Sequence, residues 1–164
     1  MYLYTMQNTD IYSLKLRMLN GEEQEMSLFK GKYLLIVNTA SACGYTPQYE
    51  GLEELHKTYA EKLEVLGLPC NDFGAQEPGT EDEIQAFCTG MFGVSFPLSA
   101  KVNIKTEPIH PLIEWLTKSS LNGVSDATIN WNFNKFLVSP DGKWMQYFPS
   151  SVKPLDEQII ALIK

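Results

Sequence analysis

The sequence predicts an α/β fold for residues 1–164, with a mixed central sheet flanked by helices on both faces. Two short apolar runs are each followed by a helical pattern, which is typical of parallel strands joined by helices. A hairpin signal and a last helix follow near the C-terminus, which adds antiparallel strands. With 164 residues and 44% apolar side chains, the chain is expected to form one domain around one core.

The first predicted strand is the continuous apolar run at residues 33–37, short enough for a strand buried on both faces. A helix is predicted to follow from Pro47, which suits a first helical position, with Thr46 as its N-cap. Tyr49 and Leu52 then recur at helical spacing.

The second predicted strand is "KLEVLGLPC", residues 62–70. After it, Thr80 and Glu83 form a capping-box signature that opens a helix over residues 80–93. The helical period puts four side chains on one buried face of that helix: Ile84, Phe87, Cys88 and Met91.

Three elements complete the prediction. A helix follows Pro111, and residues 134–148 form a hairpin around the turn Pro140-Asp141-Gly142. The last helix is expected to start near Pro154. It is predicted to turn these side chains inward: Leu155, Ile159 and Leu162.

The negative charge of the chain disfavours some classes of binding partner. A net charge of −7 and a pI near 4.8 make phosphates and anionic lipid unfavourable partners, so we expect neither nucleic-acid binding nor stable membrane association. No apolar run approaches the roughly 18 residues of a spanning helix. The first ten residues lack the basic and apolar regions of a secretory signal, which favours a cytoplasmic protein.

The cysteines and histidines of the sequence argue against a disulfide framework and against a metal site. Three cysteines with no Cys-x-x-Cys pair favour reduced thiols over a disulfide framework. His56 and His110 lie far apart without ligand spacing, and both are expected on the surface of helices. The sequence therefore predicts neither a metal nor another cofactor.

Cys43 is the candidate for chemistry, in the stretch "NTASACGYTPQY". It follows a predicted buried strand and precedes a predicted helix, which is where open α/β sheets carry their sites. The unpaired N–H groups and partial positive charge of a helix N-terminus stabilise a thiolate, and Gly44 leaves the sulfur open to approach. Thr46 stands where a Cys-x-x-Cys motif would have its second cysteine, which favours a peroxidase-type nucleophile over a disulfide reductase.

Three segments carry a family resemblance: "NTASACGYTPQYEGLEELHKTY", "LGLPCNDFGAQEPGTEDEI" and "WNFNKFLV". In content and order they closely resemble the signature blocks of the glutathione peroxidase family, and the likeness runs over nearly the whole chain. The resemblance implies a thioredoxin fold and the reduction of hydrogen peroxide and organic hydroperoxides, lipid hydroperoxides among the candidates, to water or alcohols.

The resemblance also implies site residues. Cys43 matches the family's peroxidatic position, and Gln76, Trp131 and Asn132 match its glutamine, tryptophan and asparagine. Together these three side chains offer uncharged N–H donors, which suit a thiolate and oxygens gaining negative charge. We expect at least one of their nitrogens within about 4 Å of the sulfur.

The other two cysteines are assigned through the same resemblance. Cys88, in "EIQAFCTGMFG", matches the resolving cysteine of the family's non-animal branch, although its place on the apolar face of a predicted helix by itself favours a packed core residue. A Cys43–Cys88 disulfide would require its helix to unwind and would be a substrate for thioredoxin. Cys70 matches a position generally taken as non-catalytic and is expected to be buried.

Some features set this chain apart within the resemblance. Asp72 replaces a usual glutamine, and the segment between Trp115 and Trp131 lacks the insertion through which tetrameric members assemble, so a monomer is expected. Cationic residues for glutathione are not evident near the blocks, which favours thioredoxin. The alternatives are a peroxide sensor or redox relay with the same cysteines, a glutathione-dependent peroxidase, a thiol–disulfide exchange protein and a binding module that kept the fold.

Overall fold

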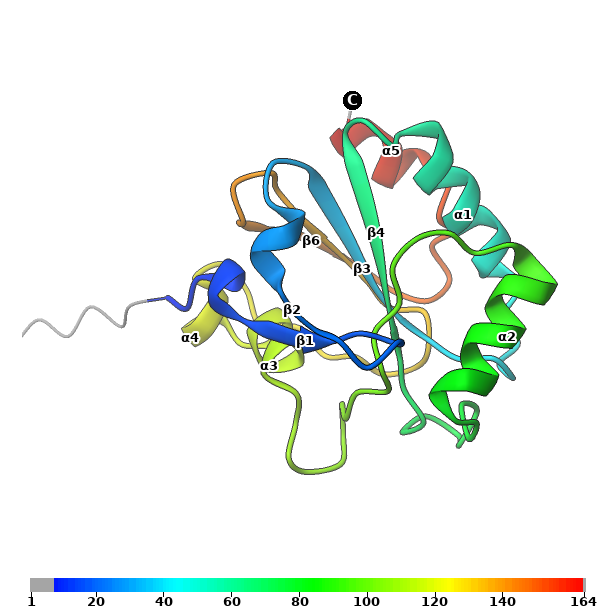
Figure 1. Cartoon of the computed structure of the whole chain (residues 1–164). Coiled ribbons are helices and arrows are strands. Elements are labelled where there is room, and N and C mark those ends of the chain that lie inside the picture. The colour runs from blue at the N-terminus through cyan, green and yellow to red at the C-terminus, as the bar shows by residue number, and fades with distance from the viewer. Residues whose placement is uncertain (1–7, 164) are drawn as a thin grey trace, which may run out of the picture.

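A four-stranded mixed sheet forms the centre of the protein. Strand β3 (Tyr33–Thr39) pairs in parallel with β4 (Leu63–Pro69) and antiparallel with β5 (Lys135–Val138). Strand β6 (Trp144–Phe148) pairs antiparallel with β5 and completes the order β4-β3-β5-β6. The predicted mixed sheet and the hairpin around Gly142 are therefore confirmed (Figure 1).

The structure is a computed structural model that describes residues 8–163. Residues 1–7, which include most of the segment inspected for a secretory signal, and residue 164 lie outside the described residues.

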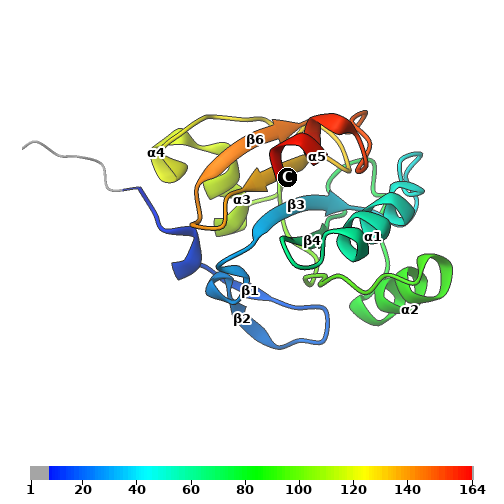
Figure 2. The same cartoon turned by 90° about the horizontal axis from the view of Figure 1, so that it is seen from above.

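Helices cover both faces of the sheet (Figures 1 and 2). Three helices pack on the face that presents the β3 side chains Leu35 and Val37: α1 (Gln48–Thr58), α2 (Glu81–Phe92) and α5 (Glu157–Ile163). The opposite face, with Leu34 and Ile36, packs against α3 (Pro111–Thr117) and the short α4 (Ser119–Asn122). Because successive strand residues alternate between faces, this continuous apolar run contributes to two separate apolar clusters.

An N-terminal hairpin was absent from the sequence prediction. Strands β1 (Lys15–Arg17) and β2 (Glu23–Glu25) pair antiparallel between the short 3-10 helices η1 (Ile11–Ser13) and η2 (Met26–Phe29). Their side chains extend the apolar cluster on the α3 face. The Asn20-Gly21 pair in the connecting loop, with Gly21 at φ 88°, is a recognisable turn signal that predicts such a hairpin.

The predicted capping box of α2 is confirmed. The Thr80 side chain accepts from the Glu83 N–H, and the Glu83 carboxylate accepts from the Thr80 N–H. The predicted buried face is correct at Ile84 and Cys88 but wrong at Met91, which is 67% exposed; in the last turn of the helix it is Phe92 that packs inward, against Tyr49 of α1.

The last helix also differs from its prediction. It begins at Glu157 rather than near Pro154, and Leu155 and Leu162 are both 37% exposed. Ile159 is buried as predicted, and α5 also buries Ile163, one turn further on; Leu155 lies before the helix begins. None of the helices described here has the length and apolar character needed to cross a bilayer.

Candidate active site

Cys43 lies in the turn that links the end of β3 to the start of α1. The Thr46 hydroxyl accepts a hydrogen bond from the Cys43 N–H at 2.9 Å and donates to the Ala40 carbonyl at 2.8 Å. The prediction that Thr46 is the N-cap of α1 is therefore wrong. Pro47 occupies that position, and its side chain makes no capping bond. The threonine hydroxyl instead fixes the turn that carries the cysteine.

The Cys43 sulfur is nearly buried, with the residue 8% exposed. Among the described residues, its hydrogen-bond donor is the backbone N–H of Tyr45, 3.3 Å from Sγ. Among the described residues, no hydrogen bond joins the sulfur to the side chains of Gln76, Trp131 or Asn132; the bond to the sulfur comes from a backbone amide. Gly44 has nothing within 4 Å of its missing Cβ, so the approach to the sulfur stays open.

A loop that carries Gln76 is fastened to the cysteine turn. The Ala42 N–H donates to the Gln76 carbonyl at 3.1 Å. Next to it, the Glu77 carboxylate accepts from the Ser41 N–H at 2.6 Å and the Ser41 hydroxyl at 2.8 Å. Glu77 is only 1% exposed, and burial raises its pKa although the bonds from Ser41 act in the opposite direction. A buried carboxylate thus joins the two loops.

Trp131 lies against the same loop from the other side. Its ring packs edge-on against Phe73, with centroids 6.2 Å apart. A Cβ on Gly74 would lie 2.8 Å from the Trp131 ring, so this contact and the positive φ of 69° both require glycine there. Trp131 packs against both apolar clusters, one of which contains Cys43.

Asn132 orients Gln76. The fully buried Asn132 donates from Nδ2 to the Gln76 Oε1 at 3.0 Å and to the Phe73 carbonyl at 3.3 Å. Both of its N–H groups are therefore engaged by these two acceptors. Among the described residues, no protein acceptor takes a hydrogen bond from Gln76 Nε2 or Trp131 Nε1.

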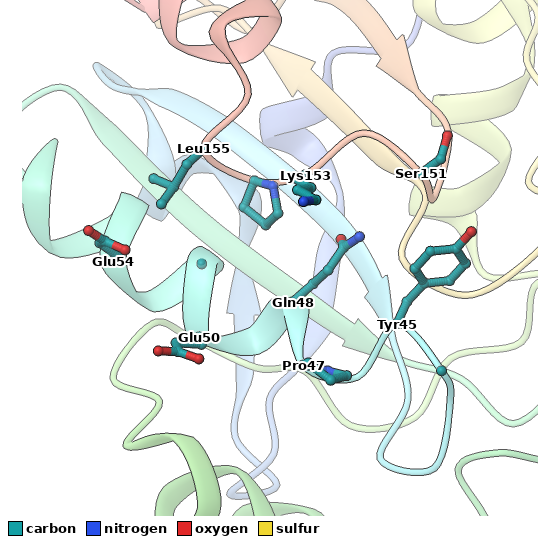
Figure 3. Close-up of a pocket in the computed structure, with 11 residues that line it drawn as sticks. Tyr45, Pro47, Gln48, Glu50, Glu54, Ser151, Lys153 and Leu155 are labelled. Atoms are coloured by element: carbon teal, nitrogen blue, oxygen red, sulfur yellow. The ribbon is translucent and has the colours of Figure 1, made fainter.

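Two hollows flank Tyr45. One, of about 400 Å³, is lined by Tyr45 and Trp131, together with Asn130, Pro149, Ser150 and Ser151. The other is a mostly apolar groove of about 430 Å³ between the start of α1 and the segment before α5, lined among others by Pro47, Gln48, Pro154 and Leu155 (Figure 3). Tyr45 and Ser151 line both hollows, so the apolar groove adjoins the side of the molecule where Trp131 lies.

The remaining cysteines are buried on opposite faces of the sheet. Cys88, in α2, belongs to the apolar cluster of Cys43, whereas Cys70, at the end of β4, belongs to the other cluster. Burial raises the pKa of Cys88 to about 11, partly offset by the Tyr49 hydroxyl. Burial also raises the pKa of Cys70 to about 11, partly offset by the Asp72 N–H 3.4 Å from its sulfur. All three thiols are unpaired.

Comparison with known proteins identifies the family. The family model described as glutathione peroxidase matches residues 11–117 of this chain. The chain belongs to the glutathione peroxidase family. As a member of this family it is a peroxidase, an oxidoreductase that acts on hydroperoxides.

Two curated members of the glutathione peroxidase family illustrate the likeness. The hydroperoxy fatty acid reductase gpx1 of Synechocystis is 45% identical over 155 residues, which cover 90% of each chain. The glutathione peroxidase-like peroxiredoxin 2 of Saccharomyces cerevisiae is 42% identical over 158 residues, which cover 94% of this chain and 98% of the yeast protein.

Solved structures confirm the thioredoxin fold of this glutathione peroxidase family member. The crystal structure of Trgpx in apo form superposes with a TM-score of 0.72 at 34% identity, covering 95% of both chains. A thiol:disulfide interchange protein of the thioredoxin family from Chlorobium tepidum, 15% identical, gives a TM-score of 0.67 over 96% of this chain and 97% of its own. The second likeness concerns the fold alone.

Sequence reasoning missed two contributors to the site. The backbone N–H of Tyr45 gives no side-chain signal in a sequence, and its direction is visible only in the folded turn. Glu77 follows Gln76 directly and stands before a proline, where a solvated carboxylate is the ordinary expectation; only the fold shows its burial against Ser41.

Proposed function

We propose that Cys43 is the peroxidatic residue of this peroxidase. Its thiolate attacks one oxygen of a hydroperoxide, the O–O bond breaks, and the other oxygen leaves as alkoxide or hydroxide and takes up a proton. Cys43 is thereby oxidised to a sulfenic acid, and the hydroperoxide is reduced to an alcohol or water.

The observation that carries this proposal is the Tyr45 N–H directed at the Cys43 sulfur, beside a hollow that Trp131 also lines. The amide donates to the sulfur that attacks the hydroperoxide. The Gln76 Nε2 and Trp131 Nε1 groups supply donors for the oxygen that gains negative charge as the O–O bond breaks. Asn132 supports them by holding the Gln76 side chain through Oε1.

Cys88 is the proposed resolving thiol. In the second step its sulfur displaces the hydroxyl of the sulfenic acid, which forms a Cys43–Cys88 disulfide and releases water. Cys88 lies on the same side of the sheet as Cys43, which supports its assignment over Cys70. Because Cys88 is fully buried in α2, this step requires that helix to open.

The apolar groove beside Tyr45 supports organic hydroperoxides as substrates in addition to hydrogen peroxide. A hydrocarbon group larger than the hollow at Trp131 has an apolar surface to occupy directly beyond it. The name of the Synechocystis relative, a hydroperoxy fatty acid reductase, supports lipid hydroperoxides as members of this substrate class.

Thioredoxin is the proposed reductant of the disulfide. The yeast relative is named a peroxiredoxin, which supports a protein dithiol as the source of electrons. The groove beside Tyr45 has Glu50 and Glu54 among its lining residues against the single cation Lys153. This balance disfavours glutathione, which carries two carboxylates.

We further propose that the protein acts as one domain, as a monomer and in the cytoplasm. The three unpaired thiols support a reducing compartment. The alternative function is a peroxide sensor or redox relay that uses Cys43 and Cys88 to oxidise a partner protein. Turnover separates the two, because a sensor consumes one equivalent of peroxide and a peroxidase continues.

The decisive experiment follows NADPH consumption with hydrogen peroxide or linoleic acid hydroperoxide, in parallel thioredoxin and glutathione systems. We expect sustained turnover with thioredoxin and little with glutathione. Cys43→Ser is expected to abolish turnover while the circular dichroism spectrum and unfolding midpoint stay close to those of the unsubstituted protein. Stoichiometric oxidation without turnover in either system would favour the relay.

A further inference from the structure

Lys135 is a buried cation that the proposed chemistry does not use. It is the first residue of β5, is 0% exposed, and donates from Nζ to the Phe133 carbonyl at 2.8 Å and the Ser150 carbonyl at 3.4 Å. Among residues 8–163, no carboxylate lies within 4 Å of Nζ. Burial lowers the pKa of this lysine to about 7. An ammonium placed in a core without a counter-ion destabilises the fold. Stability therefore does not explain why a lysine occupies this position.

One of those bonds fixes the backbone directly after Trp131 and Asn132. Phe133 has a positive φ of 63°, which is uncommon for a side chain of this size. Its N–H donates to the Asn38 carbonyl at 2.6 Å, and its carbonyl accepts the hydrogen bond from Lys135 Nζ. The lysine thus holds the turn in a conformation that the backbone alone disfavours.

The neighbouring carbonyls of the same turn are held by side chains as well. The Trp131 carbonyl accepts from the amides of Asn38 and Asn134, each at 2.9 Å. The Asn132 carbonyl accepts from the Ser150 hydroxyl. Every carbonyl from Trp131 to Phe133 therefore accepts a hydrogen bond from a side chain. For the Phe133 carbonyl, that side chain is Lys135.

The second bond connects this turn to the cysteine side of the site. The Ser150 carbonyl accepts from Lys135 and also from the side chain of Gln48, at 2.8 Å. Gln48 is the first residue of α1, the helix that follows the Cys43 turn. A continuous set of hydrogen bonds therefore runs from the start of α1, through Ser150 and Lys135, to the turn that carries Trp131.

We propose that Lys135 is a positioning residue that sets the placement of the Trp131–Asn132 turn relative to Cys43. The proposal rests on the assignment of Cys43 as the peroxidatic residue. In this role the lysine improves the alignment of the Trp131 and Gln76 donors with the reacting oxygen, while its buried charge makes the fold less stable than an apolar side chain would. Small displacements of such groups have large effects on rate.

The test replaces Lys135 by methionine, which is of similar length and apolar, and measures two quantities. We expect Lys135→Met to lower the second-order rate constant for oxidation of Cys43 by hydrogen peroxide between about tenfold and a hundredfold. The free energy of unfolding is expected to stay equal or rise, since a buried unpaired charge has been removed. Lys143→Met, an exposed site on the same hairpin, is the charge-matched control and should change neither quantity.

Lys135→Gln retains an N–H donor on a shorter chain and should recover part of the lost rate. A Lys135→Met protein with an unchanged rate constant would overturn the proposal. So would one that loses stability, or fails to fold with either substitution, because the lysine would then serve the fold. If the unsubstituted protein forms no Cys43 sulfenic acid with peroxide, the proposed function fails instead, which a dimedone adduct at Cys43 detects independently.

Discussion

The side-chain amide of Asn132 donates to the side-chain oxygen of Gln76 across 3.0 Å, and both residues come from loops that are 56 positions apart in the chain. This bond engages the Gln76 oxygen, and in the proposed mechanism the Gln76 nitrogen is the end of the amide that donates to the substrate. A planar amide held at its oxygen presents its N–H groups in a fixed direction, so the bond determines where that donor points.

Asn132→Ala removes this bond and leaves the Gln76 amide free to rotate. We expect the rate constant for peroxide oxidation of Cys43 to fall about ten- to hundredfold. The measurement is stopped-flow oxidation of the reduced protein, with thermal unfolding as a check, because a fully buried amide also contributes to stability. Asn132→Asp keeps the size but cannot donate from the same position, and a normal rate in that variant would contradict the orienting role.

Cys70→Ser tests the structural assignment of the third cysteine. Cys70 is fully buried on the face of the sheet opposite to Cys43, and serine introduces a hydroxyl without an assured partner. We expect the free energy of unfolding to fall by about 1–3 kcal/mol, measured by urea titration. Peroxide turnover per folded molecule should stay unchanged. Loss of turnover with normal stability would place Cys70 in the chemistry.

Cys88→Ser should separate the two chemical steps. The variant is expected to react with the first equivalent of peroxide at a normal rate and then to lose thioredoxin-supported turnover, because the Cys43 sulfenic acid has no resolving thiol. In the unsubstituted protein, peptide mapping after one equivalent of peroxide should show Cys43 joined to Cys88. A Cys43–Cys70 linkage would refute the two-cysteine scheme, and Cys70→Ser is the matched control.

Asp72 predicts a dependence of stability on pH at the acid end. Burial raises the pKa of this carboxylate, but hydrogen bonds from Lys105, Ile104 and Thr106 lower it more, to about 2. A group with a depressed folded pKa contributes stability above its unfolded value of 3.8, and that contribution is lost as the pH falls from about 4 to about 2.

Asp72→Asn should therefore lower stability at pH 7 and show a shallower loss between pH 4 and pH 2. Urea midpoints at pH 7, 4, 3 and 2 provide the measurement, with Glu61→Gln as an exposed control. Parallel curves for the Asp72 variant and the unsubstituted protein would show that these hydrogen bonds do not select the ionised form.

The sequence predicts those elements whose signals are local. The capping box at Thr80 and the turn at Gly142 each depend on a few neighbouring residues, and both are confirmed. Thr46 shows the limit of such signals. Its hydroxyl can accept a hydrogen bond either from an N–H of the helix that follows or from the N–H of Cys43, and in the structure it accepts from Cys43. That choice depends on where the Ala40 carbonyl lies, which the whole turn decides.

In the candidate site, too, some features can be predicted from the sequence and others depend on the folded backbone. The family resemblance predicts Cys43, Gln76, Trp131 and Asn132 as site residues, but not which N–H groups are already engaged by protein acceptors. Lys135 lies in "NKFLV", where a lone charge within an apolar strand is a signal that can be read. Its partners, the carbonyls of Phe133 and Ser150, belong to backbone that no side-chain pattern encodes.

The burial of Cys88 has a consequence for how much peroxide the protein tolerates. In the proposed scheme, the sulfenic acid on Cys43 persists for as long as α2 takes to open. At low peroxide flux the helix opens before a second peroxide arrives, and the catalyst is regenerated. At high flux the second peroxide arrives first and converts the sulfenic acid to sulfinic acid, which ends the cycle. The stability of one helix thus sets an upper dose, which the sulfinic fraction measured against peroxide concentration would reveal.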